Sequence, residues 1–131
     1  MGSRTTSRRL AMQAIFQADA SSVDVNEALD NLFADEKVAD GSKQFAINLA
    51  NGVMKNINEI DGHLTRSLKN WAMDRISSVD KSILRLALYE IIFEKATPKA
   101  VVINEALELA KRYSDKDSAR FVNGILGSFV V

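Results

Sequence analysis

Apolar residues recur at intervals of three and four along most of this chain, the spacing that places side chains on one face of an α-helix. The longest stripe follows Ser42 and stays in phase across Gly52 and Gly62, so it predicts one long helix, bent at most; its apolar positions are Ala46, Leu49, Val53, Ile57, Ile60, Leu64 and Leu68. Trp71, beyond this stripe, is interpreted as a lid on the core. No segment has the alternating pattern of a strand. The chain is therefore predicted to be all-α.

Two shorter helices precede this stripe. Apolar residues on one face predict a first helix from about Thr6 to Ala18. Polar residues then interrupt the pattern, and Asp24 with Glu27 forms a capping pair for a second helix that ends near Ala34.

Three further helices are predicted after the stripe. The first begins at residues 77–78 and has a very wide apolar face, so we expect it to lie at the centre of the fold. The next begins at Thr97 and Pro98, a cap followed by a ring with a preset φ. Ser114 and Asp117 form a capping box for the last helix. Because the connections are short, neighbouring helices should pack antiparallel in a compact bundle of six to seven helices.

The composition restricts the possible functions. A chain of 131 residues is the size of one globular domain, predicted to span residues 1–131. Lys+Arg (17) balance Asp+Glu (17), so any nucleic-acid site must come from local clustering of charge. The absence of cysteine excludes disulfides and thiolate metal sites and fits a reducing cytoplasm. No apolar run reaches the roughly 18 residues needed to cross a bilayer. We predict a cytoplasmic protein without membrane contact.

Catalytic patterns are missing from the sequence. His63 is the single histidine, so neither a Ser-His-Asp nor a Cys-His arrangement is available, and Glu59 with His63 is interpreted as a surface pair. There is no P-loop and no dinucleotide-binding glycine motif. We therefore predict no enzymatic activity, no cofactor and no metal site.

The densest basic cluster lies at the amino terminus. Arg4, Arg8 and Arg9 precede the first acidic residue, Asp19, and Arg8 and Arg9 open a helix whose free amides can also face phosphate. A solvated, frayed chain end is the alternative, and without further information the more common one.

Three separated segments resemble the NusB family of transcription antitermination factors. Residues 102–127 read VINEALELAKRYSDKDSARFVNGILG, which is similar to the family's carboxy-terminal signature; residues 83–91 (ILRLALYEI) and 8–17 (RRLAMQAIFQ) resemble its fourth and first helices. The resemblance implies two packed helical sub-bundles and antitermination of ribosomal RNA operons. It also implies binding to boxA RNA and to the ribosomal protein NusE, with other Nus factors and RNA polymerase as indirect partners.

The resemblance also implies which residues bind RNA. The family has an arginine-rich amino terminus that contacts RNA; here Thr5 and Thr6 make this patch thinner. A late helix with the family's DS-x-K/R-FVN pattern faces RNA, and the matching residues are Asp117, Ser118, Arg120, Phe121 and Asn123. These side chains suit stacking on, and hydrogen bonding to, unpaired bases. Asp117 should contact a base rather than a phosphate. We expect the arginine-bearing start and the Phe121 segment to form a single outward-facing surface.

Two aromatic residues have competing interpretations. Phe121 lies next to Val122 and one turn before Ile125, so burial in the core is about as plausible as RNA contact. Phe16 lies one turn after Met12, where a second buried face is the commoner explanation. The family nevertheless has an aromatic near this position that borders the RNA and partner surface, so Phe16 is kept as a candidate.

The predicted partner contacts lie near the start of the fourth helix of the family. Asp80, Lys81 and Arg85 are placed on its exposed side, where the family contacts NusE, although Asp80 also suits the helix dipole. Two other functions stay open at this point. One is a homodimeric protein-interaction module, and the other is a stand-alone RNA-targeting domain related to ribosomal RNA methyltransferases.

Overall fold

The computed structural model describes residues 3–68 and 72–129, and these contain helices but no strand. The α-helices are α1 (Ser3–Ser21), α2 (Val25–Asp35), α3 (Asp40–Lys55), α4 (Ile57–Ser67), α5 (Ser78–Tyr89), α6 (Lys99–Tyr113) and α7 (Lys116–Ser128). A 3-10 turn, η1 (Met73–Arg75), precedes α5, and a π-helical turn, η2 (Glu90–Glu94), extends it. The all-α prediction is confirmed.

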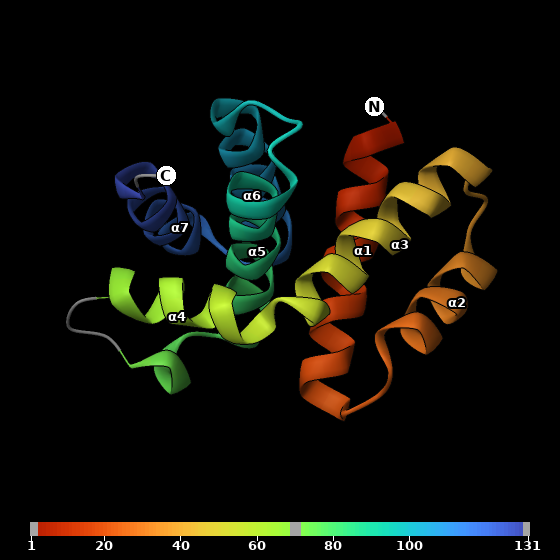
Figure 1. The fold of residues 1–131 in the computed structure, drawn as a ribbon, viewed down its shortest axis with the longest axis horizontal. Helices are drawn as coiled ribbons and strands as arrows, with labels where there is room; N and C mark the ends of the chain where they lie inside the picture. The colour runs from red at the N-terminus through yellow and green to blue at the C-terminus, as the bar shows by residue number, and fades with distance from the viewer. Residues whose placement is uncertain (1–2, 69–71, 130–131) are drawn as a thin grey trace.

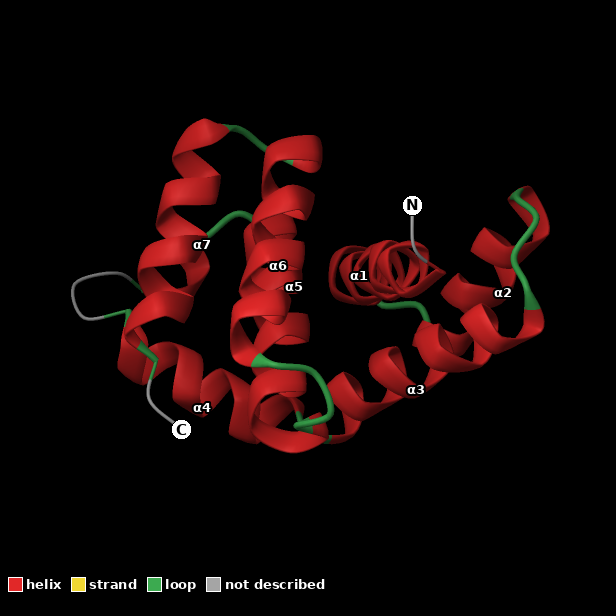
Figure 2. Ribbon diagram, turned by 90° about the horizontal axis from the view of Figure 1, so that it is seen from above, coloured by secondary structure: helices red, strands yellow, loops and turns green. Residues whose placement is uncertain are grey.

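The helices form two packed sub-bundles. Figure 1 shows α1, α2 and α3 on one side of the molecule and α4 to α7 on the other, with α3 and α4 running on from one side to the other. Seen from above in Figure 2, α1 lies almost end-on between α2 and α3 on one side and the pair α5 and α6 on the other. It packs against all four of these helices. Helix α1 is therefore shared between the two sub-bundles.

Helix α5 is central, as its wide apolar face predicts. It packs against α1, α3, α4, α6 and α7. Every residue of its middle turns is buried, namely Ser82, Ile83, Leu84, Arg85, Leu86, Ala87 and Leu88. No helix in the described ranges is long and apolar enough to cross a bilayer.

The predicted long third helix is wrong, because the chain leaves helical geometry at Asn56. This residue has φ −109° and ψ 18°, and its side-chain amide donates to the Gly52 carbonyl oxygen at 2.8 Å. The apolar stripe stays in phase across the break because α4 begins at the next residue. Gly52 also has a packing role. A Cβ built there would lie 2.2 Å from Cζ of Tyr89, so the absent side chain makes room for that ring between α3 and α5.

The helix boundaries are close to the predicted ones. Asp24 caps α2 by accepting a hydrogen bond from the Asn26 amide at 2.7 Å, as expected. The predicted caps of α6 and α7 are each wrong by one residue. Pro98 is itself the cap of α6, and Asp115 rather than Ser114 caps α7, accepting from the Ser118 amide at 2.8 Å. The lid predicted at residue 71 falls outside the described residues.

Candidate RNA-binding surface

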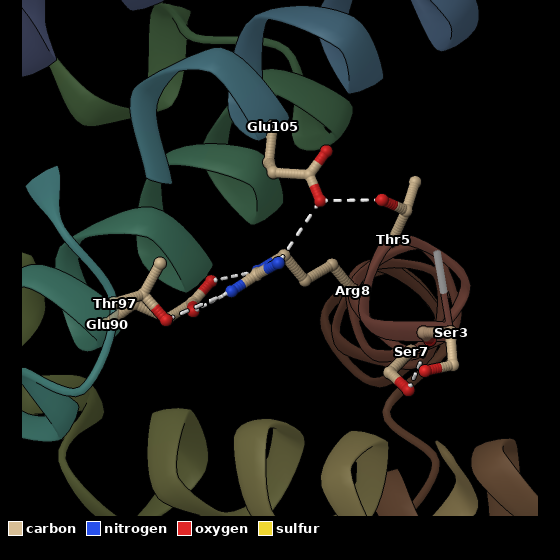
Figure 3. Close-up of polar contacts among 7 residues, drawn as sticks. All are labelled: Ser3, Thr5, Ser7, Arg8, Glu90, Thr97 and Glu105. Carbon is tan, nitrogen blue, oxygen red and sulfur yellow. Dashed lines mark hydrogen bonds and ion pairs between the residues drawn. The ribbon is translucent and has the colours of Figure 1, made fainter. Parts of the chain in front are cut away.

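The arginine at position 8 is buried and bound on several sides. Its Nε and Nη2 donate to the two carboxylate oxygens of Glu90, each at 2.8 Å, and its Nη1 donates to Glu105 at 3.1 Å (Figure 3). Thr97 Oγ1 accepts from Nη2 at 3.2 Å, and Thr5 donates to Glu105 at 2.7 Å. Arg8 is 4% exposed and Glu90 1%. We call these five residues the Arg8 network.

The Arg8 network ties α1 to η2 and α6. Burial alone would lower the pKa of the Arg8 guanidinium, but the hydrogen bonds and negative charges of Glu90 and Glu105 outweigh burial and raise it. The arginine is therefore charged at every physiological pH, and its charge is used inside the protein. The predicted outward-facing position of Arg8 is wrong, since a helix that packs on both sub-bundles buries this face.

The other two amino-terminal arginines point in different directions. Arg4 is exposed, and its Cζ lies 3.9 Å from the centre of the Phe45 ring, on the side of α1 that faces α3. Arg9 lies on the side that faces the ends of α2 and α6. Its Nη2 donates to Glu36 at 2.7 Å and its Nη1 to Gln13 at 3.2 Å. The three arginines therefore do not form one patch.

Arg9 is charged and partly accessible. Its pKa is raised chiefly by the hydrogen bond to Glu36, which outweighs the lowering effect of burial. Its side chain is 16% exposed. Arg9 also lines a groove together with Arg112, near the carboxy-terminal end of α6.

A first hollow lies next to Arg9 on α1. It has a volume of about 280 Å³ and is lined by Met12, Gln13, Phe16, Gln17, Leu32, Val79 and Tyr113. Phe16 and Tyr113 are both half-buried, so part of each ring faces solvent. Two aromatic rings with two glutamine amides beside them provide stacking faces and hydrogen-bonding groups suited to unpaired bases. Phe16 therefore stays a candidate, and Tyr113, which the sequence did not indicate, lies beside it in the same hollow.

A second hollow, of about 340 Å³, lies between the start of α5 and the start of α7. Its lining residues are Arg75, Ile76, Ser77, Asp80, Asp115, Asp117, Ser118 and Phe121. Phe121 is half-buried and packs partly against the core, so the core interpretation holds in part, and RNA contact stays a prediction. Three of the five predicted residues of the late helix line this hollow.

The two hollows flank the first turn of α5, because Val79 lines the first and its neighbour Asp80 lines the second. The α1 segment and the Phe121 segment therefore border a common feature, although Arg4 and Arg8 take no part in it. We call this combined region the aromatic surface, defined by Phe16, Tyr113 and Phe121 around the start of α5.

The two remaining predicted residues of α7 point to solvent. Arg120 has a side chain that is 79% exposed, and it makes a loose ion pair with Asp117 at 3.4 Å. Asn123 is exposed as well. Both are accessible to a ligand that extends beyond the second hollow.

The predicted partner residues are less exposed than expected. Asp80 is 7% exposed, and its Oδ1 has no hydrogen-bond partner in the described parts of the chain. Lys81 is half-buried. Arg85 is 8% exposed, with Nε and Nη2 donating to Asp61 at 2.8 Å each and Asp19 lying 3.4 Å away. Placing Asp80 and Arg85 on an exposed side is wrong, because α5 is covered on nearly all faces.

The histidine has a local role. His63 Nδ1 lies 3.1 Å from Arg66, not paired with Glu59 as predicted, and its ring meets Phe129 edge-on at 5.6 Å. Among the described residues, no three potential metal-ligating side chains of the His, Cys, Asp and Glu types gather in one place.

Comparison with known proteins identifies the family. The sequence model described as the NusB family matches residues 5–130. The transcription antitermination protein NusB of Bacillus subtilis (strain 168) is 42% identical over 125 residues, which cover 95% of this chain and 92% of that protein. The chain belongs to the NusB family.

Solved NusB structures have the same fold. T. maritima NusB superposes with a TM-score of 0.88 at 38% identity, covering 95% of this chain and 87% of that one. A chain from a structure of the antitermination factors NusB and NusE in complex with dsRNA superposes with a TM-score of 0.90 at 25% identity, covering 96% of this chain and 94% of that one. The predicted NusB resemblance and its two-sub-bundle fold are confirmed.

The NusB signature of this chain contains two further surface residues that the sequence reading passed over. Tyr113 lines the first hollow, and Arg112 lines a neighbouring groove between α1 and α6. Both stand at the end of the quoted ELAKRY segment. A basic and an aromatic residue directly before the capped start of α7 were the sequence signal that could have identified them.

Proposed function

We propose that this protein is a transcription antitermination factor that binds boxA-type single-stranded RNA together with NusE, in support of ribosomal RNA operon transcription. One observation carries the proposal: a NusB-family chain whose whole fold matches that found in a complex of NusB and NusE with dsRNA. The chemistry is assembly, with no bond made or broken, and no cofactor is required.

The aromatic surface is the proposed place of RNA contact. Phe16 and Tyr113 offer partly exposed ring faces in one hollow and Phe121 another ring in the second. Each base stacked on an aromatic side chain contributes about 1–3 kcal/mol. Ser118 and Asn123 would supply hydrogen bonds to base edges, and Asp117 would accept from a base amino group. The neutral net charge of the chain makes modest affinity for RNA alone the expected result.

The proposed contact with NusE is at the start of α5, next to the second hollow. Asp80 Oδ1 is buried without a partner in the described residues, and a buried acceptor of this kind is stabilised by a donor from a binding partner. RNA and NusE would then bind adjoining parts of one surface, and each would raise the apparent affinity of the other. Other Nus factors and RNA polymerase would be reached through this complex.

The test is RNA binding measured by fluorescence anisotropy, with a boxA-like single strand, a scrambled strand and a duplex, each with and without NusE. We expect the boxA-like strand to bind best and NusE to tighten its binding. Equal binding of boxA-like and scrambled strands in the presence of NusE would contradict the proposal. Light scattering on the same samples distinguishes a homodimer, whose mass would be unchanged by RNA.

A matched pair of variants localises the contact. Phe121→Leu keeps an apolar side chain but removes the stacking face, so it should weaken boxA binding by about 1–3 kcal/mol, roughly 5- to 150-fold. Phe33→Leu is the control, because Phe33 is also half-buried but lies on α2 beneath Lys43. Equal losses in the two variants would remove Phe121 from the proposed site.

A further inference from the structure

An ion pair lies at the edge of the aromatic surface. Arg9 on α1 donates to Glu36, the residue that caps the end of α2, at 2.7 Å. The side chain of Glu36 is 39% exposed, whereas that of Arg9 is 16% exposed. The carboxylate is thus the more solvent-exposed member of the pair.

A second arginine also acts on this carboxylate. The pKa of Glu36 is lowered chiefly by its hydrogen bond from Arg9 and further by the charges of Arg9 and Arg112. Arg112 is exposed near the end of α6, with its Cζ 5.3 Å from the ring centre of Tyr113. Glu36 therefore occupies a position where two arginines from different helices favour negative charge.

The same two arginines line one groove. This groove lies between α1 and α6, has a volume of about 180 Å³, and is lined by Thr5, Thr6, Arg8, Arg9, Glu105, Glu108, Leu109 and Arg112. Of its acidic residues, Glu105 is bound within the Arg8 network, and Glu108 is solvent-exposed with Lys111 3.8 Å away. The guanidinium groups of Arg9 and Arg112 are the groups of this lining that suit an added anion, once Arg9 is released from Glu36.

We propose that Arg9 and Arg112 form a phosphate-binding subsite for the RNA backbone, and that Glu36 occupies this subsite in the free protein and is displaced when RNA binds. The proposal rests on the RNA-binding function proposed above. Arginine pairs with phosphate as readily as with carboxylate, through the same planar fork of donors. Because water reaches the Glu36 carboxylate and weakens its attraction to Arg9, this contact can be exchanged for a phosphate.

This arrangement places a backbone contact beside the base contacts. Arg9 donates to Gln13, which lines the first hollow together with Tyr113, so the subsite and the stacking faces adjoin. A strand whose bases stack on Phe16 and Tyr113 would bring a phosphate to Arg9. Glu36 then lowers the affinity for RNA, because a phosphate must first displace its carboxylate from Arg9.

The test is a double-mutant cycle on boxA-like RNA affinity at several salt concentrations. Glu36→Gln should raise the affinity about two- to fivefold, the range that corresponds to an exposed ion pair. Arg9→Ala should lower the affinity and reduce the salt slope by about 0.7, the value for one lost phosphate contact on a single strand. Glu36→Gln should bring no gain when it is added to Arg9→Ala.

The control is Glu27→Gln, which makes the same change of net charge on an exposed residue in the first turn of α2. Equal gains from Glu27→Gln and Glu36→Gln would overturn the inference, as would a gain that persists without Arg9. Either result leaves specific RNA binding by the unaltered protein intact and so leaves the proposed function standing. Absence of RNA binding by every variant, with NusE present, would instead overturn both.

Discussion

Two adjacent arginines in α1 differ completely in their surroundings. Arg8 is buried among Glu90, Glu105 and Thr97 and connects both sub-bundles, whereas Arg9 lies beside a solvent-facing carboxylate at the edge of the aromatic surface. Consecutive helical residues point about 100° apart. One step along the sequence therefore separates a charge used for structure from a charge available for binding.

The comparison shows how a chain with no net charge can still present a local anion site. Arg8 contributes to the basic appearance of the amino-terminal sequence, yet two carboxylates compensate it inside the fold. Arg9 is compensated by one exposed carboxylate that solvent also reaches. What matters for binding is whether the counter-charge can be displaced, and burial decides that.

The largest effect on stability is expected from removing the buried arginine. Arg8→Ala leaves Glu90 buried without its cation, and loss of one member of a buried ion pair costs about 3–5 kcal/mol. Urea unfolding followed by circular dichroism measures this loss. Arg9→Ala is the comparison, with a change within about 1 kcal/mol expected because water reaches its partner carboxylate. Similar losses for the two variants would show that the distinction between these arginines is wrong.

An intermediate effect is expected from disturbing the packing next to Glu90 without changing any charge. Gly52→Ala would place a Cβ 2.2 Å from Cζ of Tyr89, so the ring must move, and the overpacking cost of about 1–3 kcal/mol should outweigh the gain of up to about 1 kcal/mol in helix propensity. Gly124→Ala in α7 is the control. Nothing lies within 4 Å of its added Cβ, and the higher helix propensity of alanine should stabilise it by up to about 1 kcal/mol. Thermal unfolding of both variants should give shifts of opposite sign.

The smallest effect concerns the titration of the exposed pair. Because Arg9 lowers the pKa of Glu36 in the folded protein, this pair stabilises the fold above the ordinary glutamate pKa and loses that contribution as the pH falls through the lowered value. An NMR titration of the Glu36 carboxyl carbon should give a midpoint below the ordinary one. Arg9→Ala should return it towards the ordinary value, and RNA should do the same in the unaltered protein. An unchanged midpoint in Arg9→Ala would contradict the pairing.

Local pattern predicted the helices well and the site only in part. The stripe spacing and the Asp24 cap depend on residues within a few positions of one another, so these features can be read directly from sequence. The break at Asn56 could not be read, since the apolar stripe stays in phase across it. The burial of Arg8 and Arg85 depends on carboxylates from other helices, which spacing does not reveal. Phe121 and Phe16 were selected only because of the family resemblance. Tyr113 lies within the stretch that carries this resemblance, yet it was not selected.

The Arg8 network can form only late in the synthesis of the chain. Arg8 pairs with residues 82 and 97 positions later in the sequence, so its partners emerge from the ribosome only when most of the protein has been made. Chains grow at roughly 5–20 residues per second, so α1 waits several seconds before its charged face can be covered. During that interval the nascent first helix exposes the cation that the finished protein hides.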